Sequence, residues 1–144
     1  NEFVLTSEKL QLAPEMKMFA PGNLRATSSE EWYLKLMEHW VKSGYTLRYS
    51  GGMVPDVNQI LKKCGGVFTY PGYQEKPLGK LRLLYECAPM AFLVEQAGGS
   101  AAFYNRETKQ SGRILDLEIS ALHQTTSIFL GSMREVEKVA AYFP

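Results

Sequence analysis

The residue types best suited to chemistry gather between positions 48 and 86, where charged and phenolic side chains recur among apolar ones. An arginine presents a planar fork of donors that fits phosphate oxygens, and a lysine that follows a glycine can reach toward an anion. Two adjacent glycines let a ligand approach the backbone closely. The residues are Arg48, Tyr49, Gly51, Gly52, Tyr70, Lys80, Arg82 and Glu86. Their combination predicts a binding site for an anionic ligand.

Glu86 lies between Tyr85 and Cys87 in an apolar neighbourhood. A carboxylate without a partner is unfavourable in such surroundings, so we expect Glu86 to be buried beside a lysine, an arginine or a metal ion. Mg²⁺ is a suitable metal because it prefers carboxylate oxygens. The residue types alone leave the salt bridge and the metal site both open.

Each remaining candidate also has a structural interpretation. The arginines could be solvated charges at strand ends, the tyrosines could be core or rim residues, and the glycine pair could mark a turn. His123 is interpreted as a hydrogen-bonded structural histidine, because no second histidine and acid accompany it as a catalytic triad would require. From residue types and spacing, the chain is an α/β domain with an anion site whose activity stays open.

Strands and helices alternate along the chain, which is typical of a layered α/β domain. Strands are expected at residues 1–10, 45–50, 67–70, 81–85 and 127–130, and the stretches 18–25 and 71–79 are expected to be loops. Helices are expected from a Ser28–Glu31 capping box to Gly44, over residues 53–64, over a buried segment 89–97, and after a Ser132–Glu135 capping box. Most of the candidate residues then fall at strand ends, where ligands gather in open α/β sheets.

The composition is that of an ordinary globular domain, with 144 residues, 45% of them hydrophobic and 22% charged, and a formal net charge of +1. This balance argues against a nucleic-acid binder or a membrane-surface binder, which needs a concentrated basic face. No apolar run is long enough to span a membrane and no signal peptide is recognised, so we expect an intracellular protein that is not secreted. Cys64 and Cys87 are interpreted as reduced packing residues.

Two long motifs give the sequence a family resemblance. Residues 79–99, G-K-L-R-L-L-Y-E-C-A-P-M-A-F-L-V-E-Q-A-G-G, resemble the late segment of the fructose-1,6-bisphosphatase family. Residues 47–59, L-R-Y-S-G-G-M-V-P-D-V-N-Q, resemble its sedoheptulose-1,7-bisphosphatase relatives, and M-F-A-P-G-N-L-R-A-T at 18–27 is similar as well. The resemblance runs from about residue 17 to the end. It implies that residues 1–144 form the carboxyl-terminal sugar-phosphate-binding domain of a bisphosphatase, a layered α/β sugar-phosphatase fold with a central mixed β-sheet flanked by helices.

The resemblance implies roles for the charged and phenolic candidates. Glu86 matches the catalytic glutamate that closes the family's metal site near the reacting phosphoryl group. Lys80 matches the lysine that holds the other phosphate, at the far end of the sugar, and Tyr49 and Tyr70 fall where tyrosines bind that same phosphate. Arg48 matches an arginine that reaches into the neighbouring subunit's site.

The resemblance also implies roles for neutral residues. Gly51, Gly52 and Met53 lie where the backbone contacts sugar hydroxyls, and Asn23 matches an asparagine that contacts the distal phosphate. Arg25 departs from the pattern, because the fructose enzymes often have a tyrosine or asparagine near this position. Its role is left open, with an influence on the choice of sugar as one hypothesis.

The activity implied is Mg²⁺-dependent hydrolysis of the 1-phosphate of sedoheptulose 1,7-bisphosphate, with fructose 1,6-bisphosphate as the alternative substrate. The family's paired-glutamate loop and its D-P-x-D-G-S motif do not occur in this sequence. Because one glutamate cannot hold two magnesium ions, we expect this chain to be inactive alone and to be part of a longer enzyme. Two alternatives of another class stay open, namely a non-catalytic sugar-phosphate-binding module and an assembly domain in which Arg48 serves only an interface.

The partners implied are a sugar bisphosphate, the missing amino-terminal half of the same enzyme, and further copies of the chain in a homodimer or homotetramer. Neither nucleic acid nor a membrane is expected as a partner. The expected location is the cytoplasm or a plastid.

Overall fold

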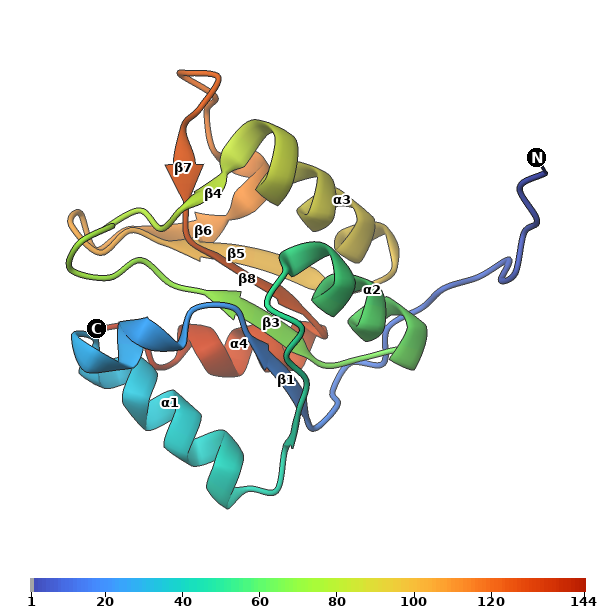
Figure 1. Ribbon diagram of the computed structural model, residues 1–144, viewed down its shortest axis with the longest axis horizontal. Coiled ribbons are helices and arrows are strands. Elements are labelled where there is room, and N and C mark those ends of the chain that lie inside the picture. The colour runs from blue at the N-terminus through green and yellow to red at the C-terminus, as the bar shows by residue number, and fades with distance from the viewer. Residues whose placement is uncertain (1) are drawn as a thin grey trace.

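The computed structural model describes residues 2–144, which form eight strands and four α-helices joined by turns and loops (Figure 1). The strands are β1 (Met18–Pro21), β2 (Thr46–Leu47), β3 (Val67–Tyr70), β4 (Leu81–Arg82), β5 (Ser100–Tyr104), β6 (Ser111–Arg113), β7 (Thr125–Thr126) and β8 (Ile128–Gly131). The α-helices are α1 (Glu31–Lys42), α2 (Met53–Lys63), α3 (Ala88–Gln96) and α4 (Met133–Ala140). Three shorter helical turns are η1 (Leu24–Ser28), η2 (Leu83–Cys87) and η3 (Ile114–Asp116).

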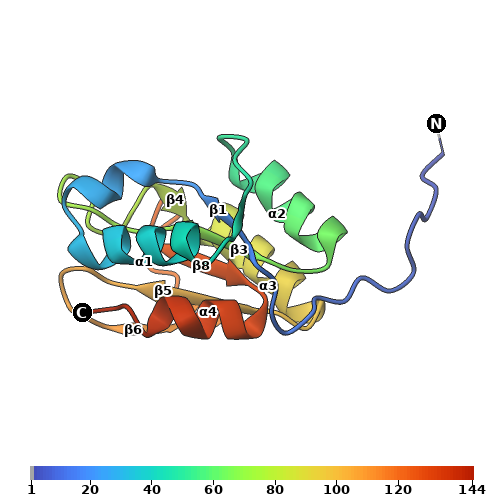
Figure 2. The ribbon, with the colours of Figure 1, turned by 90° about the horizontal axis from the view of Figure 1, so that it is seen from below.

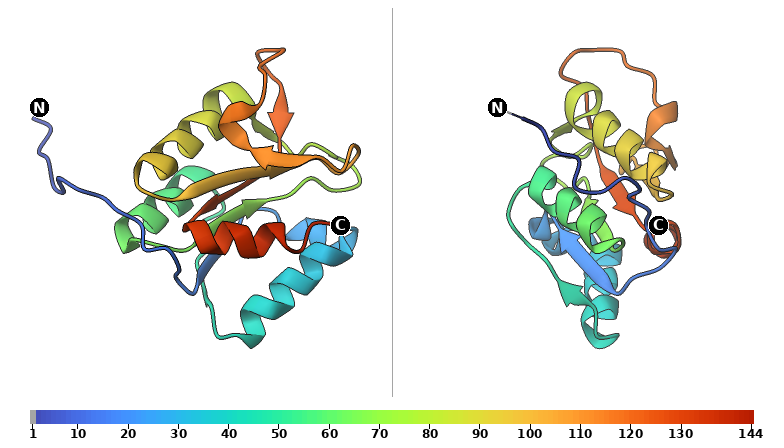
Figure 3. Two further views of the ribbon diagram at one scale, coloured as in Figure 1. Left: turned by 180° about the vertical axis from the view of Figure 1, so that it is seen from behind. Right: turned by 90° about the vertical axis from the view of Figure 1, so that its right-hand side faces the viewer.

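A mixed six-stranded sheet with the order β2-β1-β3-β8-β5-β6 forms the central layer. The strand β1 pairs in parallel with both β2 and β3, whereas β3–β8, β8–β5 and β5–β6 are antiparallel. Strands β4 and β7 form a separate antiparallel pair. Helices α2 and α3 cover one face of the large sheet, and α1 and α4 cover the other (Figure 3). The predicted fold class, a central mixed sheet flanked by helices, is confirmed.

The two-residue period of the strands divides the core between these two faces. Val67 and Phe129 point toward α1 and α4, while their neighbours Phe68 and Leu130 point toward α2 and α3. All four side chains are buried. Both faces of the sheet are covered, which accounts for the mostly apolar sequences of these short strands.

The apolar stripe predicted for α1 is confirmed. Trp32, Leu36 and Trp40 are buried against the sheet, and Gly44 follows the helix with a φ of +72° that glycine adopts readily. The fully buried Tyr33 reaches the sheet with its hydroxyl, which lies 2.8 Å from Thr69 Oγ1. Burial raises the pKa of this phenol, so it stays protonated.

Both capping boxes were wrong in their side-chain geometry. Helix α1 begins after Glu30, and the Ser28 hydroxyl instead donates to the Arg25 carbonyl within η1 at 2.8 Å. Ser132 does precede α4, but its Oγ accepts a hydrogen bond from the Gly66 backbone N–H at 3.2 Å. A local backbone carbonyl engages the Ser28 hydroxyl and a tertiary partner engages the Ser132 hydroxyl, so neither capping box forms.

Several strand and loop boundaries also differ from the prediction. Residues 2–10 form no strand and run outward as an exposed segment, and residue 1 lies outside the described residues (Figure 2). The expected loop 18–25 begins with the buried strand β1, which pairs with β2 on one side and with β3 on the other although it ends in Pro21 and is followed by Gly22. The expected strand 45–50 shrinks to β2, and 81–85 becomes β4 followed by η2.

Two expectations about burial were wrong. Helix α3 covers the sheet with one side only, and Phe92 and Leu93 on its other side are exposed. Cys64 ends α2 with a left-handed φ of +60° and is exposed, whereas Cys87 is buried as expected. The strands β5, β6 and β7 were not predicted, because their residues lack a clear alternation of apolar and polar side chains.

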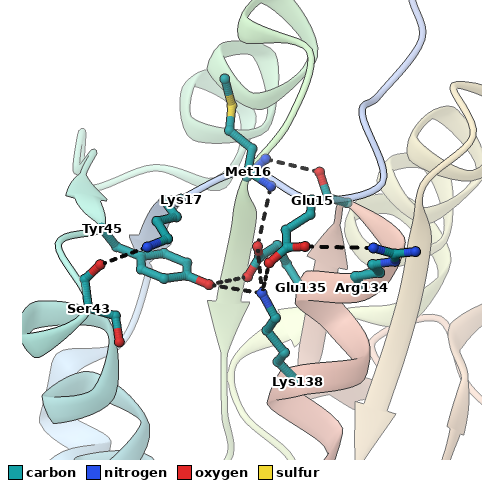
Figure 4. Close-up of polar contacts among 10 residues, drawn as sticks. Glu15, Met16, Lys17, Ser43, Tyr45, Arg134, Glu135 and Lys138 are labelled. Atoms are coloured by element: carbon teal, nitrogen blue, oxygen red, sulfur yellow. Dashed lines mark hydrogen bonds and ion pairs between the residues drawn. The ribbon is translucent and has the colours of Figure 1, made fainter.

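A buried carboxylate fastens the amino-terminal segment to the body of the domain (Figure 4). Glu135, fully buried on α4, accepts hydrogen bonds from the Met16 backbone N–H at 3.3 Å, the Tyr45 hydroxyl at 2.8 Å and Lys138 Nζ at 3.3 Å. Lys138 also pairs with Glu15. Because every oxygen of Glu135 has a donor, its burial stabilises the junction between the segment, β2 and α4.

No helix among residues 2–144 combines the length and the apolar character that crossing a membrane requires.

Candidate functional site

Two adjoining cavities open beyond the carboxyl ends of the parallel strands β1, β2 and β3. The larger, with a volume of about 440 Å³, is lined by Gly22, Gly51, Gly52, Met53, Val54, Pro55, Phe68, Tyr70, Lys80, Leu81, Arg82, Tyr85, Glu86 and Met90. The smaller, of about 220 Å³, is lined by Gly22, Asn23, Leu24, Arg25, Tyr49, Tyr70, Tyr73 and Lys80. Gly22, Tyr70 and Lys80 line both, so the two spaces meet at these residues. We call them the Glu86 cavity and the Arg25 cavity.

All of the predicted site residues except Arg48 line these two cavities. Gly51, Gly52, Met53 and Glu86 belong to the Glu86 cavity, and Asn23 and Tyr49 belong to the Arg25 cavity. Arg48 lines neither, and its Nη1 donates to the neighbouring Leu47 carbonyl at 3.3 Å on the protein surface. The structure therefore gathers eight of the nine predicted site residues around these two cavities and leaves Arg48 outside.

The glycine pair is held in place by a buried acid on α2. Asp56, only 2% exposed, accepts a hydrogen bond from the Ser50 backbone N–H at 3.0 Å with its Oδ1. The Ser50 hydroxyl closes the turn by accepting from the Gly52 N–H at 3.3 Å, and Gly51 has a φ of +87°. The first turn of α2 thus faces the Glu86 cavity, and its positive dipole end favours a negatively charged ligand there.

Glu86 is not buried as the sequence suggested, because η2 is a wide π-helical turn that brings its carboxylate to the cavity. Its Oε2 accepts a hydrogen bond from the Arg82 backbone N–H at 2.7 Å, and Arg82 Nη1 lies 3.9 Å away. The Glu86 side chain remains 33% exposed. The cation that pairs with the Glu86 carboxylate is therefore the Arg82 guanidinium, at a long ion-pair distance. The carboxylate also borders the cavity.

Tyr70 stands at the junction of the two cavities with a protonated hydroxyl. Partial burial is the largest cause that raises its pKa, and the nearby Tyr73 phenol acts in the same direction. Arg25 acts in the opposite direction and Glu86 adds to the rise. A neutral phenol can donate a hydrogen bond to an anionic oxygen, which suits a phosphate group.

Sequence reasoning did not assign several residues that line the cavities. Gly22 carries the chain past the Phe68 and Tyr70 rings, where an added Cβ would lie 2.7 Å from Phe68 Cζ. Tyr85 contributes to the Glu86 cavity, and its hydroxyl lies 2.9 Å from His123 Nδ1, which confirms His123 as a hydrogen-bonded histidine. The Pro-Gly pair at 21–22 indicates a turn in the sequence, but the sequence near it does not show that Gly22 packs against the rings of Phe68 and Tyr70.

The described residues do not by themselves fit a magnesium ion. Mg²⁺ takes about six oxygen ligands, usually from more than one carboxylate together with water. Within residues 2–144 no group of three or more His, Cys, Asp or Glu side chains could hold a metal, and Glu86 is the acid among the residues that line the two cavities. Glu86 can supply one ligand.

The fold and the cavities define an α/β domain with a cationic, phenol-rich space suited to an anionic ligand. The family described as "Fructose-1-6-bisphosphatase, C-terminal domain" matches residues 12–144. A class 1 fructose-1,6-bisphosphatase of Trichlorobacter lovleyi is 44% identical over 98% of this chain and 42% of its own length. A chloroplastic sedoheptulose-1,7-bisphosphatase of Spinacia oleracea is 48% identical over 85% of this chain and 30% of its own length.

Solved structures agree with these relatives. The apo fructose-1,6-bisphosphatase of Leishmania major superposes with a TM-score of 0.85 at 37% identity, covering 97% of this chain and 44% of that one. The chain belongs to the fructose-1,6-bisphosphatase family and matches its carboxyl-terminal domain, which confirms the resemblance found in the sequence. It spans less than half the length of these relatives.

Proposed function

We propose that this chain is the sugar-phosphate-binding part of a Mg²⁺-dependent bisphosphatase that hydrolyses the 1-phosphate of sedoheptulose 1,7-bisphosphate. The observation that supports it most is the pair of connected cavities, with an acid at one end and cationic and phenolic groups at the other. Lys80 and Tyr70 line the same cavity as Glu86, so a single extended ligand with two phosphates can contact both ends.

The Arg25 cavity would hold the phosphate that does not react. Lys80 supplies a positive charge, Asn23 and the phenols of Tyr49 and Tyr70 supply hydrogen-bond donors, and water is partly excluded. The Asn23 amide is fixed because its Nδ2 donates to the Pro71 carbonyl at 3.3 Å. Binding energy gained here would orient the reacting phosphate at the far end without taking part in bond breaking.

The Glu86 cavity would hold the sugar and the reacting phosphate. The backbone of Gly51, Gly52 and Met53 is available to sugar hydroxyls because the glycines carry no side chain. When bound, Mg²⁺ would neutralise charge on the phosphoryl group and activate water. Glu86 would provide one of its ligands, and the remaining carboxylates would come from a part of the enzyme outside residues 1–144.

We propose a role for Arg48 at an interface between two copies of the chain. It is exposed, lies outside both cavities, and follows the edge strand β2. An exposed arginine at a sheet edge can complete the Arg25 cavity of a second copy of the chain, in a homodimer or homotetramer.

The cytoplasm or a plastid is the proposed location, since the relatives include bacterial enzymes and a chloroplastic one.

The alternative substrate is fructose 1,6-bisphosphate, because relatives named for either sugar match this chain. A non-catalytic sugar-phosphate-binding module is the alternative of another class, and it is favoured by the lack of a complete metal site within residues 2–144.

A phosphate-release assay with Mg²⁺ and each bisphosphate tests the proposal. A longer enzyme that contains this chain should release phosphate, faster from the seven-carbon substrate, and Glu86→Gln should abolish release. The 144-residue chain alone should release none. Lys80→Ala should abolish sugar-phosphate binding in every form. Turnover by the isolated chain would refute the shared metal site, and binding without turnover by the longer enzyme would favour the binding module.

A further inference from the structure

The Arg25 cavity contains two cations, Lys80 and Arg25, and the sequence left the role of Arg25 open, with an influence on the choice of sugar as one hypothesis. Among residues 2–144, Arg82, Arg106, Arg113 and Arg134 each pair with a carboxylate, and Arg25 and Arg48 do not. Of these two, only Arg25 lines a cavity. An unpaired guanidinium beside the Lys80 ammonium, in a space whose described lining contains no acid, favours an anion strongly.

The backbone that carries Arg25 is firmly placed. The turn η1 is closed by the Thr27 hydroxyl, which donates to the Leu24 carbonyl at 2.7 Å, and by the Ser28 hydroxyl bonded to the Arg25 carbonyl. Ala26 next to it is fully buried, while the Arg25 side chain is exposed. The guanidinium therefore moves on a fixed base and needs no rearrangement of the chain to reach a ligand.

The order of residues along the two cavities separates Arg25 from Lys80. Glu86 lines the inner space but not the outer one, Lys80 and Tyr70 line both, and Arg25 lines the outer space but not the inner one. Arg25 also borders a further cavity on its other side, to which Glu75 contributes. Arg25 thus stands beyond Lys80 when the cavities are followed outward from Glu86. A bisphosphate anchored at the Glu86 end places its second phosphate farther outward when its carbon chain is longer.

We propose that Arg25 is a specificity-determining residue that binds the outer phosphate and favours the seven-carbon bisphosphate over the six-carbon one. This inference rests on the proposed function for its substrate class. A guanidinium can bind two phosphate oxygens at once, which the Lys80 ammonium cannot do with the same geometry. The shorter substrate keeps Lys80 and loses part of the Arg25 contact.

The first test measures binding without catalysis. The 144-residue chain is titrated by calorimetry with sedoheptulose 7-phosphate and with fructose 6-phosphate. Arg25→Gln should weaken binding of sedoheptulose 7-phosphate about tenfold, as expected for one charge-assisted contact, and should weaken binding of fructose 6-phosphate less. Arg25→Lys should have a smaller effect than Arg25→Gln on both ligands. The control Arg134→Gln removes an exposed arginine far from the cavities and should change nothing. Because Arg25 is exposed, thermal unfolding of the variant should match that of the parent.

The second test uses a longer enzyme that contains the chain. Arg25→Gln should lower kcat/KM for sedoheptulose 1,7-bisphosphate by about tenfold more than for fructose 1,6-bisphosphate, mainly through KM. Equal losses on both substrates would overturn the role in specificity, and unchanged monophosphate binding would overturn the contact itself. If the longer enzyme hydrolyses neither bisphosphate, the proposed activity fails, and the calorimetric comparison still decides whether Arg25 binds phosphate.

Discussion

Replacing Gly22 with alanine should damage the core and the site together. The added Cβ would lie 2.7 Å from Phe68 Cζ and 2.9 Å from Tyr70 Cδ2, far inside ordinary carbon contact. The rings would have to withdraw by about 0.8 Å to reach a favourable separation. Gly22 cannot move away easily, because its N–H donates to the Thr69 carbonyl at 2.8 Å.

The magnitude follows from how little space the two rings have. Phe68 is 1% exposed and packs inside the core, so its displacement should cost about 1–3 kcal/mol of unfolding free energy. Tyr70 is partly exposed at the junction of the cavities and can move into them more easily. We therefore expect the alanine methyl group to push Tyr70 into the space that a phosphate would occupy.

Urea unfolding and calorimetric binding of fructose 6-phosphate measure the two effects in the same protein. Gly112→Ala is the matched control, because its Cβ would approach only the Phe103 ring, with Cε1 at 3.2 Å, and Phe103 does not line either cavity. The control should lose well under 1 kcal/mol and keep its affinity. A Gly22→Ala chain that unfolds and binds as the parent does would show that the close approach of Gly22 to the two rings has no energetic importance.

Three further predictions concern buried groups. Glu135→Ala should lower the unfolding free energy by about 3 kcal/mol in urea, because it leaves buried donors unpaired, while exposed Glu137→Ala should change it by less than about 0.5 kcal/mol. Iodoacetamide at pH 8 should label Cys64 and spare Cys87 in the native chain; equal labelling would contradict the burial of Cys87. Burial, and then Glu86, raise the pKa of Cys87 from near 9 to about 12, so the unfolded chain loses this proton first. Stability should therefore fall as pH rises from about 9 to about 12, and Cys87→Ala should make that fall shallower in urea titrations at each pH.

The local pattern of apolar and polar residues was sufficient to predict some of the helices and strands. The stripe of Trp32, Leu36 and Trp40 predicted α1, and V-F-T-Y at residues 67–70 predicted the strand β3. The first residues of β1 are equally apolar, but the proline and glycine after them favoured a loop in a local reading. Only the pairing of β1 with both β2 and β3 explains why a strand forms there.

The candidate site residues were predicted as a set from family motifs that cluster along the chain, and all of them except Arg48 line the two cavities. Their environment was not predictable in the same way. Glu86 was expected to be buried because Tyr85 and Cys87 flank it, yet η2 turns Tyr85 and Glu86 to the cavity and Cys87 to the core. The smaller cavity also brings Arg25 together with Tyr70 and Lys80, which lie 45 and 55 residues farther along the chain. Spacing along the sequence carries no signal for such a meeting.

The wide turn η2 limits what insertions and deletions this chain tolerates. It holds five residues, Leu83–Cys87, in a loop that continues directly into α3. Removing one of them would tighten it to an ordinary α-helical turn and rotate everything before the cut by about 100° relative to α3. The carboxylate of Glu86 and the packing of Leu83 could not then both be kept, so the number of residues in this segment should be as strictly fixed as their identities.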